Sequence, residues 1–170
     1  MEGLRVHLRM LERMNVSVWY AHDILPGTEW ERERDEQLHA SDIILLLVSP
    51  YLIGSPEYYD KEVLPAMERH NRGEARVIPI ILRPVDWRMT CLSELSPLPT
   101  GGRPVTNSDW DTLDHAFFNI FTGIKQVIND IRSAPISSSA STQLEQIMHN
   151  FKQLRQQITN VVSLQGLKDF

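Results

Sequence analysis

The sequence predicts an α/β fold in which helices cover both faces of a parallel sheet. The run Ile43–Val48 is apolar without polar alternation, which is typical of a strand buried on both faces. A second β-branched run follows at Arg76–Leu82, and helical patterns lie before, between and after the two runs. The chain has 170 residues, 42% hydrophobic and 23% charged, enough for one domain with a core and an appendage.

Composition and charge exclude several classes of partner. With 17 basic and 22 acidic residues the net charge is -5, so we expect no nucleic-acid partner and no binding to an anionic membrane. No apolar run approaches the ~20 residues that span a bilayer, and Met1–Arg5 is not the start of a secretory signal. Cys91 is the only cysteine, which fits a reducing cytosol. We therefore expect a cytoplasmic protein.

Several common motifs of catalysis and binding are missing from the sequence. It contains no Gly-x-Ser-x-Gly elbow, no Gly-x-Gly-x-x-Gly fingerprint and no Gly-x-x-x-x-Gly-Lys phosphate loop. The 6 histidines are scattered without the spacing of a metal site, and Cys91 has no adjacent cysteine or histidine. We therefore expect no metal and no bound cofactor.

The N-terminal part predicts a helix, a strand and a loop. Leu4, Leu8 and Leu11 recur at helical spacing, which predicts an amphipathic helix already in progress at residue 1. Val16–Tyr20 is β-branched and aromatic, which predicts a short strand. A loop follows whose Pro-Gly pair suits the two central positions of a type II turn; its residues are Asp23, Ile24, Leu25, Pro26 and Gly27.

A charged helix is predicted after this loop. Thr28 and Glu31 have the spacing of a capping box, and the helix should run to about His39. Its apolar face is limited to Trp30 and Leu38, so we expect it to lie on the surface.

Glu62 is the most informative residue of the next helix. Ser55 and Pro56 begin this helix and Gly73 ends it. Pro65 removes a backbone hydrogen bond and should kink the helix immediately after Glu62. A carboxylate near the carboxyl end of a buried strand lies where open α/β sheets place ligand chemistry. The helical neighbours of Glu62 cannot form an ion pair with it; they are Tyr58, Tyr59, Pro65 and Ala66. The alternative to a functional role is that the Glu62 side chain points into water.

A further strand and a long loop are predicted next. The strand at Arg76–Leu82 should lie near the edge of the sheet, because Pro79 cannot donate to a ladder. Residues 83–102 are rich in proline and glycine and predict a long irregular loop, with at most a short strand at Pro104–Thr106.

The C-terminal part predicts two helices joined by a linker. An apolar stripe at helical spacing predicts a core-packing helix from about Asp109 to Arg132, with Trp110, Leu113, Phe117, Ile120, Ile124, Val127 and Ile131 on one face. Residues 133–141 are a serine-rich linker by composition. Residues 142–164 repeat apolar positions at alternating spacings of three and four, which predicts an amphipathic, coiled-coil-like helix. Such a helix would dock onto the domain, bind a partner or pair with itself.

The order of these features resembles the Toll/interleukin receptor (TIR) domain, especially its bacterial members, over residues 1–132. Asp23, Pro26 and Gly27 match the Arg-Asp-x-x-Pro-Gly segment of the family's BB loop. Tyr58-Tyr59-x-x-Glu62 matches its Trp-Cys-x-x-Glu segment, with two tyrosines in place of Trp-Cys. The resemblance implies a flavodoxin-like parallel sheet with helices on both faces.

One departure from the family lies at the start of the chain. The family begins with a strand and a short turn before its first helix, whereas this sequence starts inside that helix. In the order 2-1-3-4-5 the absent strand would lie between those at Val16 and Ile43, and would leave a gap in the middle of the sheet. Each unpaired buried backbone group would cost ~1-3 kcal/mol. We therefore expect a truncated domain, from an internal start or a fragment, rather than a repacked sheet.

The resemblance also implies a reaction. Enzymatic members of the family cleave NAD+ between nicotinamide and ribose, and the resemblance places their catalytic glutamate on Glu62. It makes NAD+ a substrate rather than a cofactor. Tyr58 and Tyr59 would flank the base or ribose, or else pack within the helix. Trp87 follows Asp86 in a segment that resembles a family feature; packing is its first interpretation, and lining the site is the alternative.

Family members also work by TIR-TIR association, so we expect other TIR domains as partners and a homo-oligomer. Ile24 and Leu25 are apolar residues at the tip of a polar loop, which favours a partner contact, although Ile24 folding back on the core is the alternative. Together these features predict a cytoplasmic signalling or defence protein that associates through TIR domains and hydrolyses NAD+ through Glu62. The alternatives are a non-catalytic scaffold or adaptor and an inactive fragment.

Overall fold

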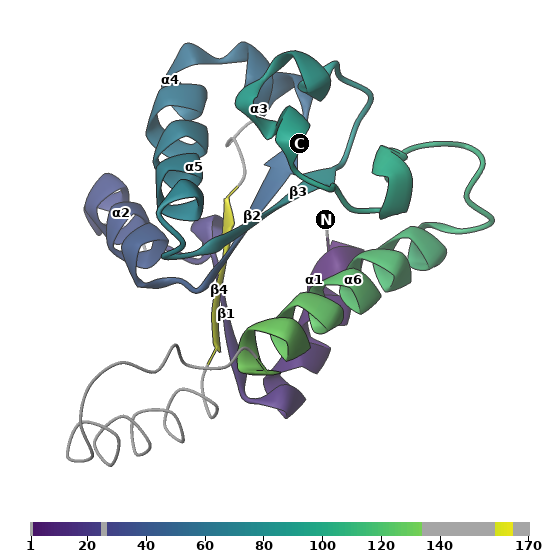
Figure 1. Cartoon of the computed structure of the whole chain (residues 1–170), viewed down its shortest axis with the longest axis horizontal. Coiled ribbons are helices and arrows are strands. Elements are labelled where there is room, and N and C mark those ends of the chain that lie inside the picture. The colour runs from purple at the N-terminus through teal and green to yellow at the C-terminus, as the bar shows by residue number, and fades with distance from the viewer. Residues whose placement is uncertain (1, 25–26, 134–158, 165–170) are drawn as a thin grey trace.

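The computed structural model describes residues 2–24, 27–133 and 159–164. Four parallel strands form a single sheet of order β1-β4-β2-β3, with helices on both faces (Figure 1). The strands are β1 (Val16–Tyr20), β2 (Ile43–Val48), β3 (Arg76–Ile81) and β4 (Thr159–Leu164). The predicted flavodoxin-like α/β fold is confirmed.

Strand β4 occupies the middle of the sheet, where the sequence predicts a gap. It runs parallel to β1 on one side and to β2 on the other, with Val161 opposite both Val18 and Ile43 (Figure 1). A strand from the C-terminal end of the chain therefore takes the place expected for the family's absent first strand. The expectation of a gapped sheet is wrong, because this strand supplies hydrogen-bond partners to both of its neighbours.

The same strand corrects the predicted helix over residues 142–164. Its last six residues, Thr159–Leu164, are extended rather than helical. Val161 falls on the helical repeat, but the adjacent pair Val161 and Val162 also suits a strand that is buried on both faces. The segment forms a strand rather than a helix because β1 and β2 each supply a row of backbone hydrogen-bond partners. Residues 142–158 of the predicted coiled-coil-like helix, and the linker after Ser133, lie outside the described residues.

Two apolar layers enclose the sheet. On one face α1 (Glu2–Arg9) and α6 (Leu113–Ser133) pack against the strands, and the predicted stripe Leu4, Leu8 and Leu11 is buried there. On the other face lie α2 (Trp30–Ala40), α3 (Pro50–Gly54), α4 (Pro56–Tyr58) and α5 (Leu64–Asn71). Val161 belongs to the first layer and Val162 to the second, because successive strand residues point to opposite faces. Strand β4 therefore joins both cores.

Two helices begin later than their sequence patterns predict. Helix α2 starts at Trp30, with Glu29 at the N-cap and no side-chain cap bond, so the capping box of Thr28 and Glu31 does not form. Helix α6 starts at Leu113 rather than Asp109. The indole nitrogen of Trp110 donates instead to the Pro104 carbonyl at 2.9 Å. Leu113 is 56% exposed, so the first buried residue of the predicted stripe is Phe117, two turns after Trp110.

The third strand and the following loop agree with their predictions. Strand β3 lies at the edge of the sheet, which accommodates Pro79. The irregular loop returns along this edge, since the Leu98 nitrogen donates to the Pro79 carbonyl at 2.8 Å and the Ile81 nitrogen donates to the Leu98 carbonyl at 2.7 Å. Gly73 ends α5 with a φ of 70°.

Candidate functional site

Glu62 lies on a widened helical turn that follows β2. Helices α3 and α4 come first, then a π-helical turn over Tyr59–Val63, in which the Leu64 nitrogen donates to the Tyr59 carbonyl, and then α5. Pro65 has no N–H and its ring would clash with the carbonyl four residues back in a regular helix. A wider turn avoids that clash, so the irregularity expected from Pro65 appears around Glu62 rather than as a kink after it. Such π turns are frequent at functional sites.

The Glu62 carboxyl is buried without a hydrogen-bond partner for one of its oxygens. The residue is 1% exposed, and its Oε2 contacts no donor among the described residues. Burial raises the pKa of Glu62 to about 7, and the charge of Arg34 opposes that rise. The alternative in which Glu62 points into water is wrong. A carboxyl with a pKa in this range can exist in either protonation state near neutral pH.

Arg34 of α2 is the counter-charge to Glu62, and sequence reasoning missed it. The residue is 3% exposed; its Nε and Nη2 donate to Asp35 Oδ1 at 3.1 Å and 2.7 Å, and the guanidinium lies 4.8 Å from the Trp30 ring centroid. Its Nη1 is buried without a partner among the described residues. The highly charged sequence of α2 predicts a surface helix, but Arg34 lies four residues from both Trp30 and Leu38, so its place on their apolar face was the signal that could have marked it as buried.

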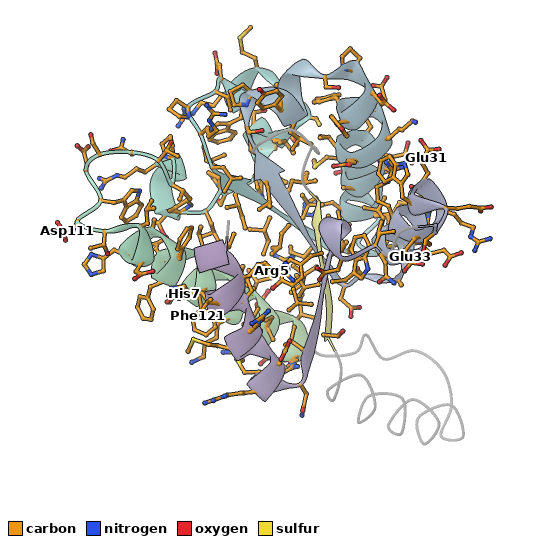
Figure 2. All side chains as sticks on the ribbon, turned by 180° about the vertical axis from the view of Figure 1, so that it is seen from behind. Arg5, His7, Glu31, Glu33, Asp111 and Phe121 are labelled. Carbon is orange, nitrogen blue, oxygen red and sulfur yellow. The ribbon has the colours of Figure 1, made fainter. Side chains whose placement is uncertain are left out.

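Side-chain contacts join helix α2 to the Glu62 turn before Arg34 and to α5 after Arg34. Lys61 Nζ donates to Glu31 Oε1 at 2.6 Å and to Glu57 Oε1 at 3.2 Å. Arg69 Nη1 donates to the carbonyls of Leu38 and Ser41, the latter at 2.9 Å. Figure 2 shows Glu31 on the opposite side of the molecule from His7 of α1. These contacts hold Arg34 between α2 and the turn that carries Glu62.

The two tyrosines before Glu62 pack on the same core. Tyr58 and Tyr59 are half-buried against the α2–α5 layer. The Tyr59 hydroxyl lies 3.3 Å from Cys91 Sγ, and burial, followed by this bond, raises the pKa of Tyr59. Cys91 thereby ties the long loop to the Glu62 turn, a contact that no sequence signal indicates. The packing interpretation of the tyrosines accounts for these contacts, and their contact with a substrate stays a prediction.

Trp87 also belongs to this core. It is 5% exposed, and the Arg88 guanidinium lies 4.7 Å from its ring centroid. Its burial agrees with the interpretation of Trp87 as a packing residue, whereas its role in lining a site stays a prediction.

The predicted BB loop contacts α1 through Asp23. Asp23 accepts two hydrogen bonds from Arg5 Nη2, at 3.0 Å and 3.1 Å. Ile24 is half-buried, and Gly27 has a φ of 87°, as the second central position of a type II turn requires. Leu25 and Pro26 lie outside the described residues. The loop's part in any site stays a prediction.

The model of the TIR-domain family matches residues 7–112, which is more than half of the chain. The chain belongs to the TIR-domain family. An uncharacterized protein, y4lF of Sinorhizobium fredii (strain NBRC 101917 / NGR234), is 38% identical over 148 residues. That match covers 82% of this chain and 45% of the relative, so this TIR-domain chain spans less than half of its relative's length. No solved structure matches the chain.

The described part of this TIR-domain chain lacks two features. No helix there is long and apolar enough to cross a membrane. The same residues contain no group of three or more metal-binding side chains.

Proposed function

We propose that this TIR-domain chain hydrolyses NAD+ at the bond between nicotinamide and ribose, with Glu62 as the catalytic carboxylate. The observation that carries the proposal is a buried carboxyl with a free oxygen and a raised pKa, on a π turn that follows a central strand. Buried titratable groups with strongly shifted pKa values cluster at functional sites. Around this reaction we propose a cytoplasmic signalling or defence role that depends on TIR-TIR association.

A single carboxylate is sufficient for the chemistry. Nicotinamide leaves the pyridinium as a neutral molecule, so the reaction needs no general acid of the kind that ordinary glycosidases use. Positive charge develops on the ribose ring as the bond breaks. A carboxylate held in a poorly solvated place stabilises that charge more strongly than water does and also accepts hydrogen bonds from the ribose hydroxyls. Glu62 Oε2 is the unoccupied acceptor that this role requires.

The test replaces Glu62 by glutamine, which keeps the shape of the side chain and removes its charge. We expect Glu62→Gln to reduce NAD+ loss by at least about a hundredfold, comparable to losing one electrostatic contact to a transition state. Glu57→Gln is the matched control, because Glu57 is an exposed carboxylate one turn earlier that pairs with Lys61. Chromatography of NAD+, nicotinamide and ADP-ribose measures turnover. Equal turnover in both variants and the wild type would remove Glu62 from the reaction.

A non-catalytic scaffold is the second candidate, and one observation favours it. At 1% exposure Glu62 is closed to solvent in this conformation, as a purely structural acid would be. A scaffold would associate through the BB loop, where Ile24 is half-buried. We expect Ile24→Glu to lower the molar mass that light scattering measures for the oligomer, whereas Glu62→Gln should not. An oligomer unaffected by Ile24→Glu would count against association through this loop.

A further inference from the structure

We propose that Arg34 is a positioning residue that favours the ionised form of the Glu62 carboxyl, and that the two side chains act as one buried pair. The inference deepens the proposed function, which needs Glu62 as an anion, but its central measurement does not depend on catalysis. Two buried polar atoms on neighbouring elements lack hydrogen-bond partners among the residues that the structure describes; they are Arg34 Nη1 on α2 and Glu62 Oε2 on the π turn.

The neighbouring contacts fix the relative position of the two residues. Glu31, one turn before Arg34, bonds Lys61, which adjoins Glu62. Leu38, one turn after Arg34, accepts a hydrogen bond from Arg69 of α5. Residues at these spacings share one helix face. Arg34 therefore faces the turn on which Glu62 lies.

The other contacts of Arg34 fix the position of its guanidinium group and involve only some of its N–H donors. Asp35 Oδ1 accepts from Nε and Nη2, and the Trp30 ring lies beneath the guanidinium. Nη1 is the part of the fork that these contacts leave unused. Arg34 and Glu62 do not hydrogen-bond each other, so one donor and one acceptor of the pair stay without a partner among the described residues.

Electrostatics give Arg34 a specific task. An isolated buried carboxyl protonates rather than carry an unsolvated charge. Arg34 is the charged group whose field opposes this effect at Glu62. The two other basic side chains that link the turn and α5 to α2 are engaged elsewhere: Lys61 pairs with Glu31 and Glu57, and Arg69 bonds backbone carbonyls and pairs with Glu74. Removing Arg34 should therefore leave Glu62 largely neutral at pH 7.

The experiment measures the titration of Glu62 directly. The side-chain carboxyl is followed by carbon NMR against pH in the full chain and assigned by its loss in Glu62→Gln. We expect Arg34→Met to raise the pKa of Glu62 by at least about one pH unit, the usual effect of an adjacent opposite charge. Arg34→Lys should restore part of the difference, because it returns the charge without the planar fork. Arg32→Met is the control, since Arg32 is exposed and pairs with Glu29 and Glu36.

Each outcome bears on the inference. An unchanged Glu62 titration in Arg34→Met overturns it. If Arg34→Met does not fold, the double variant Arg34→Met, Glu62→Gln is tested next. Recovery of the folded state in the double variant supports the pair. If the double variant also fails to fold, Arg34 has only a structural role and the inference is overturned. A shifted titration in a protein without NAD+ turnover would reject the proposed reaction and leave the role of Arg34 intact. With turnover, the acid limb of the activity profile should move upward with the pKa of Glu62.

Discussion

Strands β2 and β4 lie side by side in the same sheet, yet their sequences carry different amounts of structural information. All six residues of β2 are buried and apolar, and no helical or polar periodicity competes with that pattern. Strand β4 reads Thr-Asn-Val-Val-Ser-Leu, and its first half continues a helical repeat. The run in β2 specifies a strand locally, whereas β4 becomes a strand because β1 and β2 each offer a row of backbone partners.

The same difference between local and distant specification applies to the surroundings of Glu62. Glu62 comes after β2, α3 and α4 and lies on a turn that local sequence shapes through Pro65. Val162, from the far end of the chain, belongs to the core on which that turn packs. A locally specified element therefore depends on a distant one for its buried environment.

The largest expected effect follows from removing β4. Without residues 159–170, strands β1 and β2 would each expose a buried row of unpaired backbone groups, at ~1-3 kcal/mol for every unsatisfied group. Since a whole domain is stable by only ~5-15 kcal/mol, we expect the truncated chain to lose its cooperative thermal transition in near-ultraviolet circular dichroism. A peptide of residues 157–170 added in trans should restore it. A truncated chain that melts like the wild type would show that β4 is dispensable.

A proline substitution compares a central strand with an edge strand. We expect Val161→Pro in β4 to destabilise the domain by about 1-3 kcal/mol for the buried partner it leaves unpaired, with steric strain in addition. Pro79 already sits in edge strand β3, so Pro79→Val should change the free energy of unfolding by less than about 1 kcal/mol. Urea denaturation measures both values. Equal effects would contradict the central position of β4.

Much of the fold could be predicted because its signals are local. The burial of Leu4, Leu8 and Leu11, the strand Ile43–Val48 and the edge position of Pro79 all follow from periodicity or from covalent chemistry. The capping box does not form because α2 begins at Trp30, which makes Glu29 rather than Thr28 the N-cap. Strand β4 could not be predicted, because its partners are distant in sequence.

The site was predictable to a similar extent. Glu62 could be singled out because helical spacing shows that no neighbour can pair with it. Spacing also places Arg34 on the apolar face of its helix, but not beside Glu62, and it gives no sign of the contact of Cys91, because each reaches the Glu62 turn from another element. Their roles depend on tertiary packing, on which one-dimensional spacing carries no information.

The pH dependence of stability tests the burial of Glu62, the residue placed by the segment after β2. Folding raises the pKa of Glu62 from 4.5 to about 7, so the folded state favours the neutral acid. Its contribution to stability is present below pH 4.5 and is lost as the pH rises through 7. At about 1.4 kcal/mol per pH unit, the wild type should lose on the order of 3 kcal/mol relative to Glu62→Gln between pH 4.5 and 8. Urea denaturation of both proteins across this range measures the difference, and parallel curves would contradict the burial of an ionisable group here.

The smallest expected effect separates a cap that forms from one that the sequence only suggests. Ser49 directly follows β2, and its hydroxyl accepts a hydrogen bond from the Leu52 nitrogen at 3.3 Å. Replacing it with alanine should cost about 1 kcal/mol, the usual value for an N-cap. Thr28→Ala should change the free energy of unfolding by less than about 0.5 kcal/mol, because the N-cap of α2 is Glu29. Denaturant midpoints at fixed pH resolve the two values, and a larger loss at Thr28 than at Ser49 would show that the capping box forms in solution.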